Sequence, residues 1–277
     1  MRKSYLTNGL LLLLIIAIYW FVNYEPIEVN AHKTLSSLSI DQVHTINIKR
    51  INRDDILLTK IEDQWLITQP IQASANPTRV KLILALLSTI SHSQFKPAPS
   101  HSLQQFDLDP HKISVQINDQ VFNFGDVEPL SQYRYIQYND RIHLVDDTVA
   151  PLLNATASSF INNRLLPDDL HITKLTLPAI LAQDGASKEV VLELQDGHWM
   201  SSDSTLSSDD LTILIDAWQH AYAIQVLPAT DTIIGQPITV KFNDQTNIEL
   251  LLQFDTRSMS IINRTKKLKY QFPLANK

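Results

Sequence analysis

The segment Ile113-Ser-Val-Gln-Ile-Asn-Asp-Gln120 returns later in the chain as Ile238-Thr-Val-Lys-Phe-Asn-Asp-Gln245. The first isoleucine, the valine and the closing Asn-Asp-Gln are identical in the two segments. Apolar and polar residues alternate before each Asn-Asp pair, which is typical of a half-buried strand that ends in a turn. Because chance rarely aligns two short segments so well, they indicate an internal duplication.

The sequence upstream of each segment supports the same duplication. Trp65 and Trp199 each follow a hairpin-like run, and a helical pattern follows each of them. The first helix is expected to begin at Asn76-Pro77, an N-cap followed by a first-turn proline, and the second at Ser208. From tryptophan to the isoleucine that opens the repeated segment there are 48 residues in the first half and 39 in the second. The difference therefore falls in a connection, where length changes are tolerated.

These patterns predict an α+β fold in which an N-terminal transmembrane helix precedes two duplicated antiparallel sheet-plus-helix units. Strands are expected at residues 41–50, 56–60, 64–68, 113–117, 121–124, 133–138, 142–145, 189–194 and 198–201. A further helix is expected at residues 147–161. The expected domains are 1–27 for the cytoplasmic tip and anchor, 28–167 for the first unit and 168–277 for the shorter second unit.

The amino-terminal segment is predicted to anchor the chain in a membrane. Residues 4–24 carry no charge, and a helix of this length spans roughly 30 Å, the thickness of a bilayer core. The anchor positions are Leu10, Leu14, Ile18, Trp20 and Val22. A buried core helix is disfavoured, because the run is apolar on all sides.

The charges around this run predict its orientation. Arg2 and Lys3 precede it, and Glu25 and Glu28 follow it. The positive-inside rule then keeps the amino terminus in the cytoplasm and places the body outside the inner membrane, in the periplasm or an equivalent space. A cleaved signal peptide with a cleavage site near residues 29–31 is the alternative.

Composition excludes several classes of function. A net charge of −6 argues against nucleic-acid binding, which requires a surplus of Lys and Arg on one face. The chain has no cysteine, so it has no thiol nucleophile and no thiolate metal site. Only five glycines are present, and they form no phosphate-binding loop. We therefore expect no cofactor.

No catalytic or metal-ligating constellation is expected either. The stretch Asp168-Asp169-Leu170-His171 offers two carboxylates and an imidazole, but a loop after Pro167 explains the same residues. The other histidines lack the spacing that turns two rings toward one ion. Serines occur in no nucleophile motif, so a hydrolase is the least favoured interpretation.

The best candidate for an interaction surface is a cluster of tyrosine and arginine. It comprises Tyr133, Arg134, Tyr135, Tyr138 and Arg141. Tyr and Arg are enriched where proteins bind partners. Strand alternation would separate Arg134 from its two tyrosine neighbours, and core packing is the competing explanation for the tyrosines.

Four segments of the first half carry a family resemblance. They are Asp63-Gln-Trp65-Leu-Ile-Thr-Gln-Pro70, Phe106-Asp-Leu-Asp-Pro110, Phe124-Gly125-Asp126 and Tyr133-Arg-Tyr135. With them, residues 42–167 resemble a bacterial domain family of unknown function whose members occur beside gliding-motility-type ABC transporters as anchored extracytoplasmic companions. The turn at Phe106 lacks the glycine of that family's pattern. The resemblance implies a fold and a transporter neighbourhood, and it designates no catalytic residue.

The sequence thus predicts a non-enzymatic, membrane-anchored accessory or scaffold protein of a transporter or envelope complex, with a protein partner in that membrane or envelope. The first alternative is a module that binds glycan or lipid in the cleft between the two repeats. That alternative requires a concave site with convergent polar groups between the units.

Overall fold

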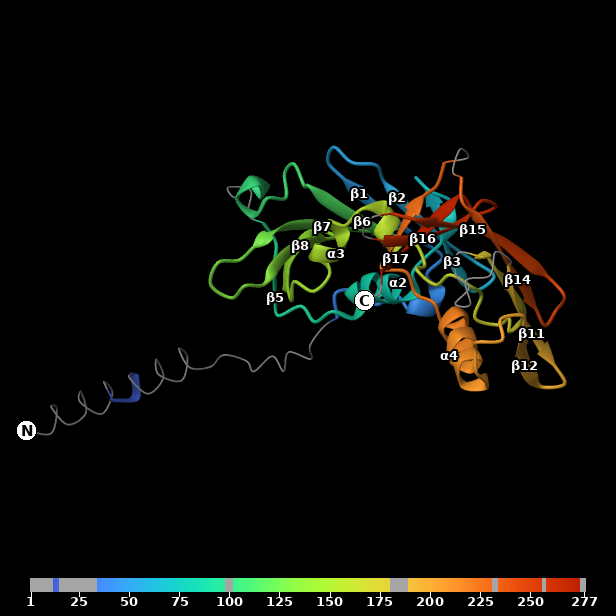
Figure 1. Ribbon diagram of the computed structural model, residues 1–277. Coiled ribbons are helices and arrows are strands. Elements are labelled where there is room, and N and C mark those ends of the chain that lie inside the picture. The colour runs from blue at the N-terminus through green and yellow to red at the C-terminus, as the bar shows by residue number, and fades with distance from the viewer. Residues whose placement is uncertain are drawn as a thin grey trace, which may run out of the picture.

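Two mostly antiparallel sheets with few helices form the body of the protein in a computed structural model (Figure 1). The structure describes residues 12–14, 34–97, 102–179, 189–230, 234–255 and 258–274. Of the predicted anchor positions, Leu14 is described, whereas Leu10, Ile18, Trp20 and Val22 lie outside the described residues. Within the described ranges, no helix has the length and apolar character needed to cross a membrane.

The first sheet has nine strands among the described residues, in the order β4-β3-β2-β1-β6-β7-β8-β9-β5. They are β1 (Thr45–Arg50), β2 (Ile56–Ile61), β3 (Gln64–Gln69), β4 (Ala73–Ser74), β5 (Ser93–Phe95), β6 (Ile113–Ile117), β7 (Gln120–Val127), β8 (Arg134–Tyr138) and β9 (Arg141–Val145). All neighbouring pairs are antiparallel.

The second sheet has eight described strands, in the order β12-β11-β10-β14-β15-β16-β17-β13. They are β10 (Ile172–Leu177), β11 (Val190–Gln195), β12 (His198–Ser201), β13 (Gln225–Pro228), β14 (Gln236–Phe242), β15 (Asn247–Phe254), β16 (Ser258–Asn263) and β17 (Leu268–Pro273). When the short β4 is set aside, the two strand orders correspond one to one. Each sheet is a three-stranded meander joined to a four-stranded meander, with an edge strand against the last strand.

Both longer helices begin where the sequence predicts. Asn76 caps α2 (Pro77–Leu84) by accepting the backbone N–H of Arg79, and a proline occupies the first turn. Ser207 caps α4 (Ser208–Gln219) in a capping box with Asp210, whose side chain accepts the backbone N–H of Ser207. Each cap satisfies donors that the first helical turn leaves free.

The prediction of a single helix at residues 147–161 was wrong. Two short turns occupy this region, α3 (Ala150–Leu153) and the 3-10 turn η4 (Ala157–Phe160). Pro151 has no N–H and is compatible only with the first helical turn, and Thr156 is extended with ψ 155 between the two turns. The remaining described 3-10 turns are η1 (Ile40–Gln42), η2 (Ala85–Ser88) and η3 (Leu103–Phe106).

Matching hairpin turns precede the two tryptophans. Glu62 and Asp63 join β2 to β3 with φ of 47° and 65°, and Asp196 and Gly197 join β11 to β12 with φ of 48° and 82°. Two-residue loops in which both residues have positive φ match the twist of an antiparallel pair. Asp and Gly tolerate this backbone conformation better than most residues.

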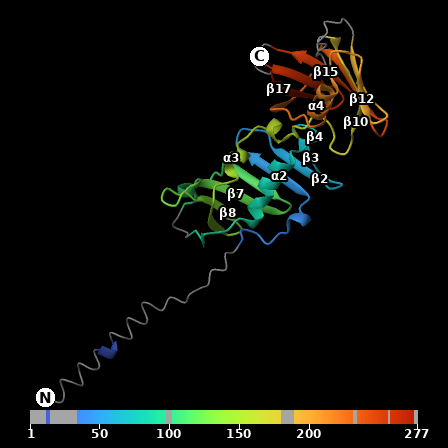
Figure 2. The same ribbon diagram turned by 60° about the horizontal axis from the view of Figure 1, so that its bottom comes forward.

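The apolar face of the first sheet packs under α2, which crosses it in Figure 2. The side chains buried there include Ile46, Ile48, Ile56, Leu58, Val115, Ile117, Phe122 and Phe124 from the strands and Val80, Ile83 and Leu84 from the helix. On the opposite face, the Phe106 ring contacts Phe95 and Tyr135, with centroids 5.6 and 4.9 Å apart. This second layer supports β5, β8 and β9, on which most of the candidate interaction residues lie.

Candidate functional site

Two of the predicted interaction tyrosines pack against rings of the protein itself. Tyr133 stacks on His92, with ring centroids 4.1 Å apart and an interplanar angle of 5°. Tyr135 meets the Phe106 ring edge-on, and burial followed by the charge of Glu128 raises the pKa of its hydroxyl above the ordinary value. Both side chains remain only half-buried.

Arg134 forms an ion pair and a hydrogen bond within the protein. Its Nε and Nη2 atoms each lie 2.7 Å from a carboxylate oxygen of Asp147, and Nη1 donates to the Gly125 carbonyl. The Arg134 and Asp147 side chains are 19% and 23% exposed. A bidentate, half-buried arginine of this kind holds β8 to the end of β9 and to the β7 backbone.

The other two predicted residues border a hollow. Tyr138 stacks on Phe122 with centroids 4.7 Å apart, and its hydroxyl donates to Gln120 Oε1 at 3.1 Å. Arg141 is exposed at the start of β9. Together they border a cavity of about 360 Å³, which we name the hairpin cavity. Its lining residues are Thr34, Leu35, Ser91, Gln94, Lys96, Tyr138, Asn139, Asp140, Arg141 and His143.

The charged groups of the hairpin cavity have no ion-pair or hydrogen-bond partner among the described residues. Lys96, Asp140 and Arg141 are exposed, and none of them forms an ion pair or hydrogen bond with a described residue. The volume falls within the roughly 300–1,000 Å³ typical of small-ligand sites. Two cations and one carboxylate therefore border a space large enough for a small polar group.

His143 forms part of the inner wall. The residue is 7% exposed, and its Nδ1 lies 2.9 Å from the Ser91 hydroxyl. Burial, followed by the charge of Arg141, holds the pKa of the imidazole below its ordinary value of 6.5. Sequence reasoning missed His143, Lys96 and Ser91. The signal for His143 was present, because Arg141 and His143 are two residues apart and share one face of a strand.

A second, smaller pocket lies between the two sheets. It measures about 140 Å³ and is lined by Asn76, Arg79, Thr156, Ser158, Ser159, Ile161, Asn163, Ile224, Gln225 and Val226. These residues come from both halves of the chain, and most are polar. The space is well below the typical size of a small-ligand site, so it suits a few waters or one small side chain.

The segment between the sheets bonds to the start of α2 on one side and to the connection between α4 and β13 on the other. Asn76 N–H donates to the Phe160 carbonyl at 2.6 Å, which ties the segment to the start of α2. On its other side, Asn163 and Ala223 exchange hydrogen bonds: the Asn163 side chain donates at 3.0 Å, and the Ala223 N–H donates at 2.8 Å. Leu165 N–H also donates to the Ala221 carbonyl at 3.0 Å. We call residues 160–165 the strap.

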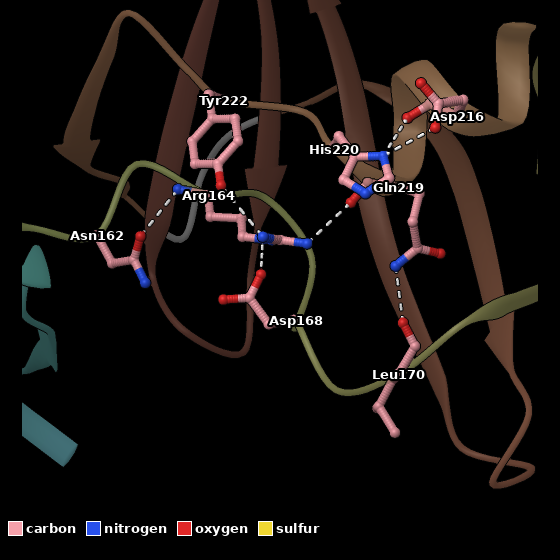
Figure 3. A network of polar contacts seen from close by, with 8 residues as sticks. All are labelled: Asn162, Arg164, Asp168, Leu170, Asp216, Gln219, His220 and Tyr222. Atoms are coloured by element: carbon pink, nitrogen blue, oxygen red, sulfur yellow. Dashed lines mark hydrogen bonds and ion pairs between the residues drawn. The ribbon is translucent and has the colours of Figure 1, made fainter. Parts of the chain in front are cut away.

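Arg164 joins the strap to the end of α4 (Figure 3). Its Nη1 donates to the Tyr222 hydroxyl at 3.1 Å and forms an ion pair with Asp168, and its Nη2 donates to the Gln219 carbonyl at 3.4 Å. The guanidinium also lies over the Tyr222 ring, 5.6 Å from its centroid. The strap and α4 are therefore held together by a planar cation with several partners.

The acidic stretch after Pro167 lies beside this network. Asp168 pairs with Arg164, and the His171 backbone N–H donates to Asn243 Oδ1 at 3.2 Å. Across the described part of the chain, no three His, Cys, Asp or Glu residues gather in a way that could hold a metal ion.

Comparison with known proteins assigns a family to this chain. No curated protein matches the chain. No solved structure matches it either. A family model described as "Domain of unknown function (DUF4340)" matches residues 65–241, a range that takes in α2, the strap, α4 and strands of both sheets. Because this match covers more than half of the sequence, the chain belongs to the DUF4340 family.

Proposed function

We propose that this chain is a non-enzymatic accessory or scaffold protein, anchored in the cytoplasmic membrane by residues 4–24, whose body binds a partner protein of the membrane or envelope on the extracytoplasmic side. The observation that carries the proposal is the hairpin cavity, because its two cations form no ion pair or hydrogen bond with any described residue. An unpaired cluster of this kind suits recognition of another molecule.

The position of the hairpin cavity fits a partner near the membrane. Thr34 and Leu35 line it, and only nine residues, 25–33, separate them from the proposed anchor. A fully extended chain covers at most about 3.5 Å per residue, so the cavity would stay within roughly 30 Å of the anchor's end. Confinement to this layer raises the effective concentration toward other membrane proteins, and a weak interface is then sufficient.

We further propose that the two sheet-plus-helix units are copies of one ancestral unit. The matching strand orders support this, and so does one shared contact. Asn118 Oδ1 accepts the N–H of His44 at 2.9 Å, and Asn243 Oδ1 accepts the N–H of His171 at 3.2 Å. Both asparagines belong to the repeated Asn-Asp-Gln and bond just ahead of the first strand of their sheet.

The alternative function is a module that binds glycan or lipid between the two repeats. The polar pocket beside the strap supports it, because Asn76, Asn163 and Gln225 converge there. Its volume of about 140 Å³ opposes it, because a sugar ring or lipid headgroup requires more room. Partnership with an ABC transporter belongs to the main proposal and rests on the family resemblance.

An anchor exchange tests the main proposal. In a strain that lacks the gene, the full chain is compared with residues 28–277 exported behind a cleavable signal peptide, and with the same body fused to an unrelated single-span helix. We expect the exported body to lose most complementation and the exchanged anchor to restore it. Full complementation by the exported body would remove the need for an anchor. Failure of the exchanged version, while it is present in the membrane, would assign the function to the native segment rather than to the body.

A further inference from the structure

The hairpin cavity brings two positive charges together across a pair of strands. In the β5–β9 pair, Ser93 lies opposite Leu144, Gln94 opposite His143 and Phe95 opposite Ile142. Lys96 directly follows Phe95 and Arg141 directly precedes Ile142, so the two cations lie next to the last pair of this register and both line the cavity. Like charges held close together repel each other, and no described acidic side chain forms an ion pair with either of these. A bound anion would relieve that repulsion.

Hydrogen-bonding groups complete the wall behind the cations. The Ser91 hydroxyl donates to the Ser93 carbonyl at 3.1 Å, which leaves its oxygen to accept from Nδ1 of His143 at 2.9 Å. Tyr138 also lines the cavity, and its hydroxyl donates to Gln120. The hairpin cavity therefore combines charged groups at its opening with a polar inner wall.

On this basis, and resting on the proposed function, we infer that the hairpin cavity binds a carboxylate of the partner protein, either an acidic side chain or a chain terminus. Lys96, just after β5, and Arg141, at the start of β9, would contact the carboxylate oxygens from two different segments. Charge-assisted hydrogen bonds of this kind are shorter and stronger than neutral ones. The planar fork of Arg141 suits a planar carboxylate.

The surroundings favour a single carboxylate over an anionic membrane surface. The β2–β3, β6–β7 and β8–β9 turns all lie at the same end of the first sheet, as the strand pairing requires. They carry the exposed acidic residues Glu62, Asp63, Asp119 and Asp140. A flat anionic surface would meet all of these carboxylates, whereas one carboxylate inside the cavity would meet two cations and the single carboxylate of Asp140.

The test measures binding of a defined probe to the full chain in a neutral detergent. The probe is N-acetyl-glutamate N-methylamide, and N-acetyl-glutamine N-methylamide is its neutral counterpart. The ring signal of His143, assigned with a His143→Gln variant, reports occupancy of the cavity by NMR. We expect a saturable shift with the acidic probe and none with the neutral one.

Charge substitutions provide the matched comparison. Removal of both cations by Lys96→Gln and Arg141→Gln is expected to weaken binding of the acidic probe at least about tenfold, the equivalent of losing one charge-assisted hydrogen bond. The control pair Lys49→Gln and Lys81→Gln removes the same charge from exposed positions outside the cavity and should change affinity less than about twofold. The opposite change, Asp140→Asn, should tighten binding.

Three results would overturn the assignment. They are an equal shift with the neutral probe, equal affinity in the two double variants, and binding of phosphatidylglycerol vesicles without binding of the acidic probe. The last result would make the cavity a lipid site. The anchor exchange tests the accessory function by an independent readout. If that experiment succeeds while the probe fails to bind, only the assignment of the cavity is lost.

Discussion

At the scale of single residues, His143 gives the body a pH-dependent stability. Its pKa lies below 6.5 in the folded protein because burial, and then Arg141, disfavour the charged ring. Below pH 6.5 the unfolded chain takes up a proton that the folded chain resists. The free energy of unfolding should therefore fall as pH decreases through 6.5 toward the folded pKa. Urea unfolding at pH 7.5 and 5.5 measures this loss, which should be smaller in His143→Gln. The exposed His111→Gln is the control, and an unchanged pH dependence in His143→Gln would contradict the assignment.

At the scale of elements, the chain at the end of η3 lies very close to Gly125 of β7. A Cβ at Gly125 would lie 2.2 Å from the Phe106 carbonyl oxygen and 3.0 Å from Cγ of the buried Leu108. Contact with backbone leaves little room for adjustment, so Gly125→Ala should lower the free energy of unfolding by about 1–3 kcal/mol.

Urea unfolding monitored by circular dichroism measures this change. The matched control is Gly197→Asn, because Gly197 has φ +82° and nothing within 4 Å of its added Cβ. Asparagine tolerates the left-handed region, so the control should change stability by less than about 0.5 kcal/mol. If the two substitutions lowered the free energy of unfolding equally, the segment around Phe106 and Leu108 would have to move away from β7 without cost.

At the scale of the whole molecule, the strap bonds to the start of α2 and to the connection after α4, and the Arg164 side chain links it to the end of α4. The Arg164 side chain is 13% exposed and touches Asp168, Tyr222 and Gln219. Arg164→Ala should lower the free energy of unfolding by about 1–3 kcal/mol, an estimate that already allows for solvent screening at the largely exposed Asp168. Calorimetry should then show the two sheets unfolding less cooperatively.

Two further variants are compared with Arg164→Ala. Arg164→Lys keeps the charge but lacks the planar fork, so it should recover only part of the loss. Lys49→Ala removes a cation from an exposed position and should leave stability within about 0.5 kcal/mol of the parent. If Arg164→Ala were as mild as Lys49→Ala, the strap would owe its order to backbone bonds and apolar packing alone.

Local patterns in the sequence were sufficient for most of the secondary structure. The starts of α2 and α4 were predicted correctly, because an N-cap and its first turn are neighbours in the chain. The repeated segments form the corresponding strands β6 and β14, since alternation of apolar and polar residues is also a local signal. The helix expected at residues 147–161 failed where a proline and an extended threonine outweighed its apolar pattern.

The candidate site required the tertiary structure, because its residues meet only through strand pairing. Lys96 and Arg141 are far apart in the sequence, and the pairing of β5 with β9 brings them to the same cavity. Likewise, no local signal predicted that Asp147 would bind Arg134, whereas Arg141 forms no ion pair with any described residue. The sequence by itself determined where α2 and α4 begin and that segments such as β6 and β14 form strands, since these depend on neighbouring residues. The tertiary structure decided which charges are paired and which face the hairpin cavity, because that depends on long-range contacts.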